Sequence, residues 1–150
     1  MPSAELALVG AVAKLLNEGL GTEATLAAVA ETLRRGLPAE AVAVWFREHG
    51  TPAFRWVQAP PTRDGPAPVR SLDAVPPRPE WRRYVMEHEG VRRGLLEVRL
   101  GEGRSDPEAL PIIADFLAPY LEAAELSTDL SATLAVLRVV AMGLVPEQSE

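Results

Sequence analysis

The side chains best suited to binding chemistry alternate along residues 81–100. With a two-residue turn at Glu89 and Gly90, residues 81–88 pair with residues 91–100, and one face of this hairpin is apolar while the other is mixed. A preceding strand at 41–47 would add an aromatic and a cationic side chain to the mixed face. An aromatic floor with a few polar anchors is typical of a small-molecule site. The candidate ligand-binding residues are therefore Trp45, Arg47, Tyr84, Met86, His88 and Arg93.

The proline-dense segment 60–79 offers a different interpretation of the same face. It holds half of the fourteen prolines, and a proline cannot donate a hydrogen bond to a sheet. The segment must run over the surface or lie across a face of the sheet. In the second case Trp45, Trp56 and Tyr84 simply pack beneath it. Both interpretations stay open at this point.

The residue types of this chain do not favour a catalytic, metal or cofactor site. There is no cysteine, which excludes disulfides, thiolate metal ligands and thiol nucleophiles. His49 and His88 each lie beside a predicted turn, and two separate histidines without a clustered set of carboxylate or thiolate ligands make a poor metal site. We expect no metal, no cofactor, no catalytic residues and no enzymatic activity.

Length and charge limit the class of protein further. The 150 residues suit one domain, and a formal net charge of −6 argues against nucleic acid as a partner. The longest apolar stretch, 132–146, is interrupted by Arg138 and is shorter than the ~20 residues that cross a bilayer. The N-terminus lacks the basic residues of a signal peptide. We expect a soluble, cytoplasmic protein without a membrane partner.

Hydrophobic periodicity predicts the elements that position these residues. Two helices precede a strand, a glycine turn and a second strand; the hairpin at 81–100 follows, and a capping box at Ser105–Glu108 opens a long helix. Pro119 should bend that helix. The predicted helices are 3–18, 22–36 and 106–126 with a further run at 128–144, and the predicted strands are 41–47, 54–58, 81–88 and 91–100. The fold class is α+β, a central antiparallel sheet with the helices on one face.

Three stretches of this chain resemble a GAF domain, a sensory module of signalling proteins. The stretches are Leu-Leu-Asn-Glu-Gly-Leu at 15–20 continuing to 37, Ala-Glu-Ala-Val-Ala-Val-Trp-Phe at 39–46, and Gly-Leu-Leu-Glu-Val at 94–98 followed by the helix at 110–126. The Asn-Lys-x-x-x-Phe-x-x-x-Asp-Glu signature of members that bind cyclic nucleotides is absent. Without cysteine, the bilin-attaching and methionine sulfoxide reductase branches are excluded. The resemblance implies a GAF-like domain at 1–127, with a C-terminal extension at 128–150, that acts in regulation or association.

The terminal helices carry apolar residues beyond those that a single core requires. GAF-like domains commonly dimerise through their first and last helices, so the resemblance implies a homodimeric bundle that in turn engages a separate protein partner. The predicted interface residues are Val9, Val12, Leu16, Leu126, Leu130, Leu134, Leu137 and Leu144. Two alternatives remain open. Residues 128–144 can fold back on their own domain, or the protein can act as a small-molecule sensor through the mixed sheet face.

Overall fold

The computed structural model describes residues 3–126, which form a four-stranded sheet and three long helices. In chain order the elements are α1 (Ser3–Leu16), α2 (Thr22–Gly36), β1 (Ala41–Phe46), β2 (Arg55–Ala59), the short 3-10 helix η1 (Leu72–Ala74), β3 (Arg82–His88), β4 (Val91–Arg99) and α3 (Ala109–Leu126). The predicted α+β class is confirmed. The predicted extension at 128–150 lies outside the described residues.

The sheet consists of two antiparallel hairpins joined edge to edge. Its strand order is β2-β1-β4-β3, and every neighbouring pair is antiparallel. The β3–β4 turn falls at Glu89 and Gly90, as the sequence predicts, and both residues adopt positive φ angles of 52° and 81°. Two consecutive residues at positive φ produce the tight turn whose twist matches a hairpin. The pairing of the central strands β1 and β4 brings residues fifty or more positions apart into contact.

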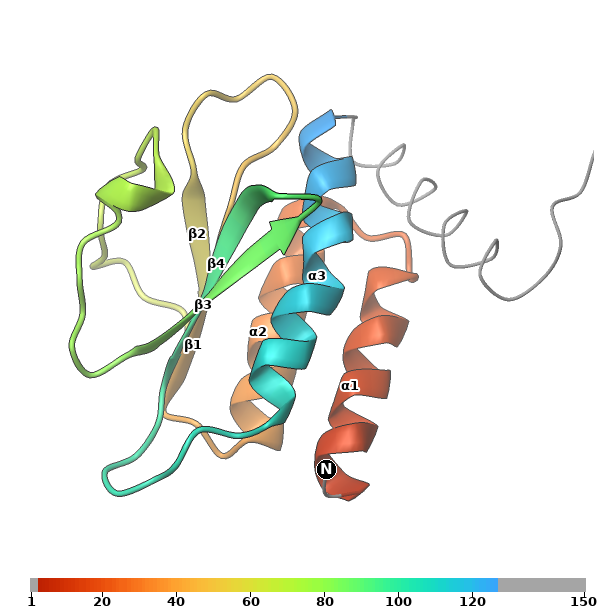
Figure 1. The fold of residues 1–150 in the computed structure, drawn as a ribbon, viewed down its shortest axis with the longest axis vertical. Coiled ribbons are helices and arrows are strands. Elements are labelled where there is room, and N and C mark those ends of the chain that lie inside the picture. The colour runs from red at the N-terminus through yellow and green to blue at the C-terminus, as the bar shows by residue number, and fades with distance from the viewer. Residues whose placement is uncertain (1–2, 127–150) are drawn as a thin grey trace, which may run out of the picture.

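The three helices lie on one side of the sheet in two successive layers (Figure 1). Helix α2 packs on β1 and β2, α3 packs on β3 and β4, and α1 lies against α2 and α3. Leu8, Val12 and Leu16 repeat every four residues and form the buried stripe of α1. A bond between distant helices supports this layer, because the backbone N–H of Ala109 donates to Glu5 at 2.9 Å.

The opposite face of the sheet is covered by the proline-dense segment. Residues from this loop, the hairpin and the central strands form a second apolar cluster: Trp45, Phe54, Leu72, Val75 and Leu95. Each of these side chains is less than a tenth exposed. The interpretation that the loop lies across the sheet is confirmed for Trp45, and Trp56 packs against the same cluster.

The predicted pairing of β3 with β4 is wrong by one residue. We expected Arg82 and Tyr84 opposite Glu97 and Leu95, whereas Arg83 lies opposite Glu97 and Val85 opposite Leu95. The cause is a bulge, because Glu87 pairs with Arg92 and Met86 already pairs with Gly94, so Arg93 is an extra residue on β4. A shift of one residue exchanges the faces of a strand.

Helix α3 begins later than the capping box predicts and continues through its proline. Its first residue is Ala109 rather than a residue directly after Ser105, and Pro119 lies within the helix. The helix lacks one backbone donor at that proline, yet Tyr120 and Leu121 immediately after it are buried in the core. Packing against the sheet therefore holds the turn that follows Pro119 in place.

Candidate functional site

The six predicted ligand-binding residues do not share one surface. Because of the bulge, Tyr84 and Met86 face the helices, where Met86 is fully buried in the main core. Trp45 is fully buried on the opposite face beneath the loop. The other three, Arg47, His88 and Arg93, meet the end of α3. The expectation of one mixed face that carries all six is therefore wrong.

A buried carboxylate holds the covering loop against the sheet. Glu97 is fully buried in β4, and its Oε1 accepts a hydrogen bond from Trp45 Nε1 at 2.9 Å. Arg83 Nε donates to Glu97 Oε2 at 3.0 Å, and the Arg78 guanidinium of the loop also pairs with Glu97. We call Trp45, Arg78, Arg83 and Glu97 the Glu97 cluster. It satisfies an otherwise costly buried charge with three donors.

Two further contacts hold the same loop. Arg83 Nη2 donates to the carbonyl of Pro76 at 2.7 Å, and Trp56 Nε1 donates to the carbonyl of Pro66, also at 2.7 Å. A Cβ at Gly65 would lie 2.1 Å from the Trp56 ring, so only glycine allows this approach. The face that the sequence offered as a ligand site is thus filled by the protein's own side chains.

A second polar cluster lies where the last turns of α3 meet the β3–β4 hairpin. Arg93 is 14% exposed and bridges the helix, with Nη1 3.1 Å from Glu125 Oε1 and Nη2 3.1 Å from Glu122 Oε2. Arg47 Nε donates to Glu125 at 2.7 Å, and His88 Nε2 lies 3.4 Å from Glu122 Oε1. We call these five residues the helix-end cluster.

Sequence reasoning missed the acidic half of this cluster. Glu122 and Glu125 are three residues apart and therefore lie on one side of α3. That spacing is the signal available in the sequence, but nothing local joins it to a hairpin about thirty residues earlier. The structure thus brings Glu122 to His88, a contact that the sequence did not reveal.

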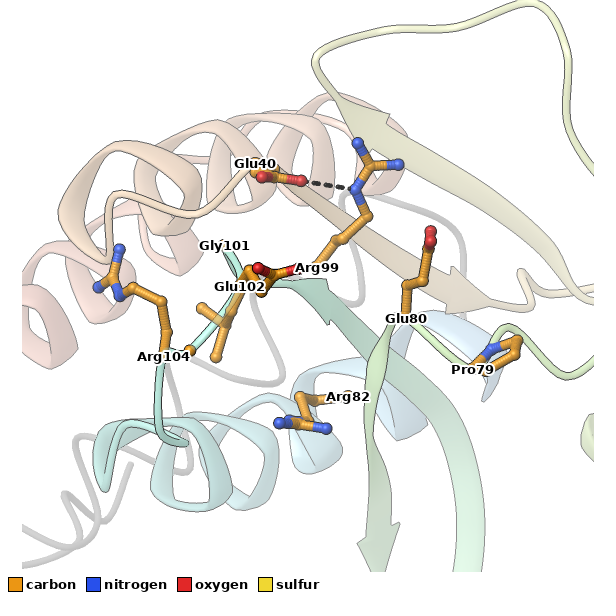
Figure 2. A pocket seen from close by; sticks show the side chains of 10 residues that line it. Glu40, Pro79, Glu80, Arg82, Arg99, Gly101, Glu102 and Arg104 are labelled. Carbon is orange, nitrogen blue, oxygen red and sulfur yellow. Dashed lines mark hydrogen bonds and ion pairs between the residues drawn. The ribbon is translucent and has the colours of Figure 1, made fainter.

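An open cleft of about 380 Å³ lies beside the C-terminal end of β4 (Figure 2). Three arginines and three glutamates line it: Arg82, Arg99, Arg104, Glu40, Glu80 and Glu102. Each arginine is already engaged: Arg99 with Glu40 at 2.8 Å, Arg82 with Asp106 at 2.6 Å, and Arg104 with two backbone carbonyls. The cleft therefore offers no uncommitted cation to an anionic ligand.

Two ionisable groups near these features have displaced pKa values. Burial, with the nearby Asp106 carboxylate as the next cause, raises the pKa of Tyr84 to about 12. A hydrogen bond from Arg92 lowers the pKa of Asp73, which lies in η1. Neither shift brings a group toward neutral pH, where acid–base catalysis operates.

The surface of α3 carries a stripe of exposed apolar side chains. Ile112, Phe116 and Leu126 are 44%, 37% and 65% exposed, and Pro119 and Ala123 between them are partly exposed. The spacing of these five residues is 4, 3, 4 and 3. They therefore form one seam along the helix. We call these five residues the α3 seam.

The predicted interface residues fall into three groups. Leu126 is exposed at the end of the α3 seam. Val12 and Leu16 are buried in the core, because they form the stripe of α1 that packs on α2 and α3, so their expected place in an interface is wrong; Val9 is only partly buried. Leu130, Leu134, Leu137 and Leu144 lie outside the described residues.

Comparisons with known proteins return no counterpart. No family model, no curated protein and no solved structure matches this chain. Among the helices of residues 3–126, none has the length and apolar character that a bilayer crossing requires.

Proposed function

We propose that this chain is a non-enzymatic, GAF-like regulatory module that works by self-association through α3. The observation that carries the proposal is the α3 seam, an exposed apolar stripe on a helix whose opposite side is fully buried. Exposed apolar side chains in a row mark an interaction surface. The seam contains no charged residue, so two copies can pack seam to seam about a two-fold axis without burying an unpaired charge.

The sequence beyond α3 extends the same heptad register. Continuing the 4, 3 alternation from Leu126 reaches residues 130, 133, 137, 140 and 144, of which four are apolar: Leu130, Leu137, Val140 and Leu144. Sustained apolar positions at this spacing are typical of a coiled-coil seam. The proposed partner is therefore a second copy, paired along α3 and the segment that follows it. A stable pairing would bury about 800 Å² on each chain.

The closed sheet face favours association over small-molecule sensing. A ligand on the Trp45 face would have to displace the loop, with its buried residues Leu72 and Val75, and break the Glu97 cluster. In the proposed module that face is structural, and the helix layer carries the signal to a separate protein partner. The GAF resemblance supports this division of roles, since such domains commonly associate through their terminal helices.

Sedimentation equilibrium of the full chain tests the proposal. The unmodified protein should be a dimer at low micromolar concentration. Phe116→Glu should raise the dissociation constant by about 30-fold or more, because a central apolar contact is worth about 2 kcal/mol. Ile112→Glu should act in the same direction.

The matched control is Val85→Glu, which places the same charge at an apolar residue of β3 that is 41% exposed. Val85 pairs with Leu95 and therefore lies on the sheet face opposite the helices. This variant should dimerise like the unmodified protein. A monomeric unmodified protein, or equal losses for Phe116→Glu and Val85→Glu, would contradict the proposal. Circular dichroism of each variant confirms that the fold is retained.

A further inference from the structure

We propose that His88, Glu89 and Glu122 form a binding site for a divalent transition-metal ion of the Zn²⁺ class. The three side chains come from the end of β3, the hairpin turn and the penultimate turn of α3. One donor atom from each lies within 4.8 Å of the others. The proposal does not depend on self-association.

The distances within this group suit a metal better than a hydrogen bond. His88 Nε2 and Glu122 Oε1 are 3.4 Å apart, which is longer than the ~2.7–2.9 Å of a charge-assisted hydrogen bond. A tetrahedral ion with ligand bonds of about 2.0–2.1 Å separates its ligands by about 3.3 Å. The observed pair therefore already spans one edge of such a tetrahedron.

The third ligand needs only a small movement. Glu89 Oε2 lies 3.9 Å from His88 Nε2 and the donor atoms of all three residues lie within 4.8 Å of one another, so Glu89 must approach its two partners by about 0.5–1.5 Å to complete the tetrahedral edges. The Glu89 side chain is 77% exposed and can make this adjustment by a change of rotamer. Three protein ligands leave the fourth position of a tetrahedral ion to water.

Neighbouring residues orient the central ligand. Arg93 Nη2 binds the other oxygen of Glu122, Oε2, at 3.1 Å and leaves Oε1 directed at His88. Arg93 is itself held by Glu125, which Arg47 also contacts. Carboxylates that bind metals are generally fixed by such outer hydrogen bonds. Two arginines, Arg47 and Arg93, therefore face three carboxylates, those of Glu89, Glu122 and Glu125, and the group keeps one net negative charge.

The donor set selects the class of ion. One imidazole nitrogen with two carboxylate oxygens suits Zn²⁺, Co²⁺ and Ni²⁺, whereas Mg²⁺ and Ca²⁺ prefer sites made only of oxygen. A bound ion would link the β3–β4 turn to the end of α3, a few residues from Leu126. The site would therefore make the geometry of the C-terminal helix end responsive to metal.

The test is a titration of tag-free protein with Zn²⁺ by calorimetry, with Co²⁺ absorption as the reporter of tetrahedral coordination. The chain contains two histidines, so His49→Gln is a matched control for His88→Gln. We expect one ion per chain for the unmodified protein and for His49→Gln. His88→Gln and Glu122→Gln should each weaken binding at least tenfold.

Nitrogen NMR of the two imidazoles gives a readout that does not depend on the variants folding. Zn²⁺ should shift the His88 Nε2 resonance of the unmodified protein and leave His49 unchanged. Absence of binding at about 1 mM Zn²⁺, equal losses for the two histidine variants, or a shift at His49 would each overturn the proposal.

Discussion

Replacing Glu97 with glutamine tests whether the buried carboxylate holds the loop on the sheet. Glutamine keeps the volume of the side chain and can still accept the hydrogen bond from Trp45 Nε1. It removes the negative charge that Arg78 and Arg83 share, and it can direct an N–H at one of those donors. The perturbation is therefore electrostatic and leaves the packing intact.

The structure sets the size of the expected loss. A hydrogen bond to a charged partner contributes about 1.5–3 kcal/mol, and breaking a buried ion pair costs about 3–5 kcal/mol. Arg78 and Arg83 are 24% and 34% exposed, so both regain part of their hydration once the carboxylate is gone. Arg83 also keeps its bond to the Pro76 carbonyl. We therefore expect a loss of about 3 kcal/mol, at the lower end of the buried-pair range.

Urea unfolding followed by far-ultraviolet circular dichroism measures this loss. With a slope of about 2 kcal/mol per molar urea, the midpoint should fall by about 1.5 M. The control is Glu40→Gln, because Glu40 is half-exposed and pairs with Arg99 at 2.8 Å. An exposed pair of this kind is worth less than about 1 kcal/mol. The reasoning is refuted if Glu97→Gln costs no more than Glu40→Gln.

The remaining predictions concern the backbone and two titrating groups. Gly94→Ala should destabilise the fold, because the added Cβ would lie 2.3 Å from a backbone oxygen of β1. Gly10→Ala should stabilise the fold by about 0.5–1 kcal/mol, because nothing lies within 4 Å of the added Cβ in α1. The midpoints of urea unfolding test both predictions. The folded pKa of Tyr84, about 12, exceeds its ordinary value of 10.0, so its contribution to stability is complete below about pH 10 and is lost as the pH rises toward 12. Tyr84→Phe should therefore flatten the fall in stability over that range in alkaline unfolding curves. Arg92→Gln should return the lowered pKa of Asp73 toward its ordinary 3.8, as carboxyl NMR titration would show.

Local patterns predict the elements of this fold well, because their causes lie close together in the chain. The stripe of α1, the turn at Glu89 and Gly90 and the continuous apolar run of β1 each depend on residues a few positions apart. Helix α3 is the partial exception, since the backbone N–H of Ala109 bonds to Glu5 on another helix. A capping motif in the local sequence cannot predict a hydrogen bond between residues so far apart in the chain.

The candidate sites were harder to predict, because each depends on a contact or a register shift that involves residues far apart in the sequence. The extra residue Arg93 in β4 shifts the pairing and moves Tyr84 and Met86 to the helix side of the sheet. The burial of Glu97 requires Arg78, which comes from a loop without regular pattern. The pairing of His88 with Glu122 requires the β3–β4 hairpin to dock on α3. No local sequence pattern indicates the bulge, the burial of Glu97 or the contact between His88 and Glu122. The sequence did allow both interpretations of the sheet face, a ligand site or a covering loop, to be stated before the structure decided between them.

The strand order also determines how this chain reaches its folded state. Within each hairpin the strands are neighbours along the chain, and β3 and β4 need only a two-residue turn, so both hairpins can form within microseconds. The β1–β4 ladder is different, because it joins residues such as Trp45 and Leu95 across the whole proline-dense segment. Closing that long loop carries an entropy cost before any contact compensates for it. We therefore expect pairing of β1 with β4 to be the slowest step of folding. The hydrogen bond between Trp45 and Glu97 can form only after this step, because it joins the same two strands.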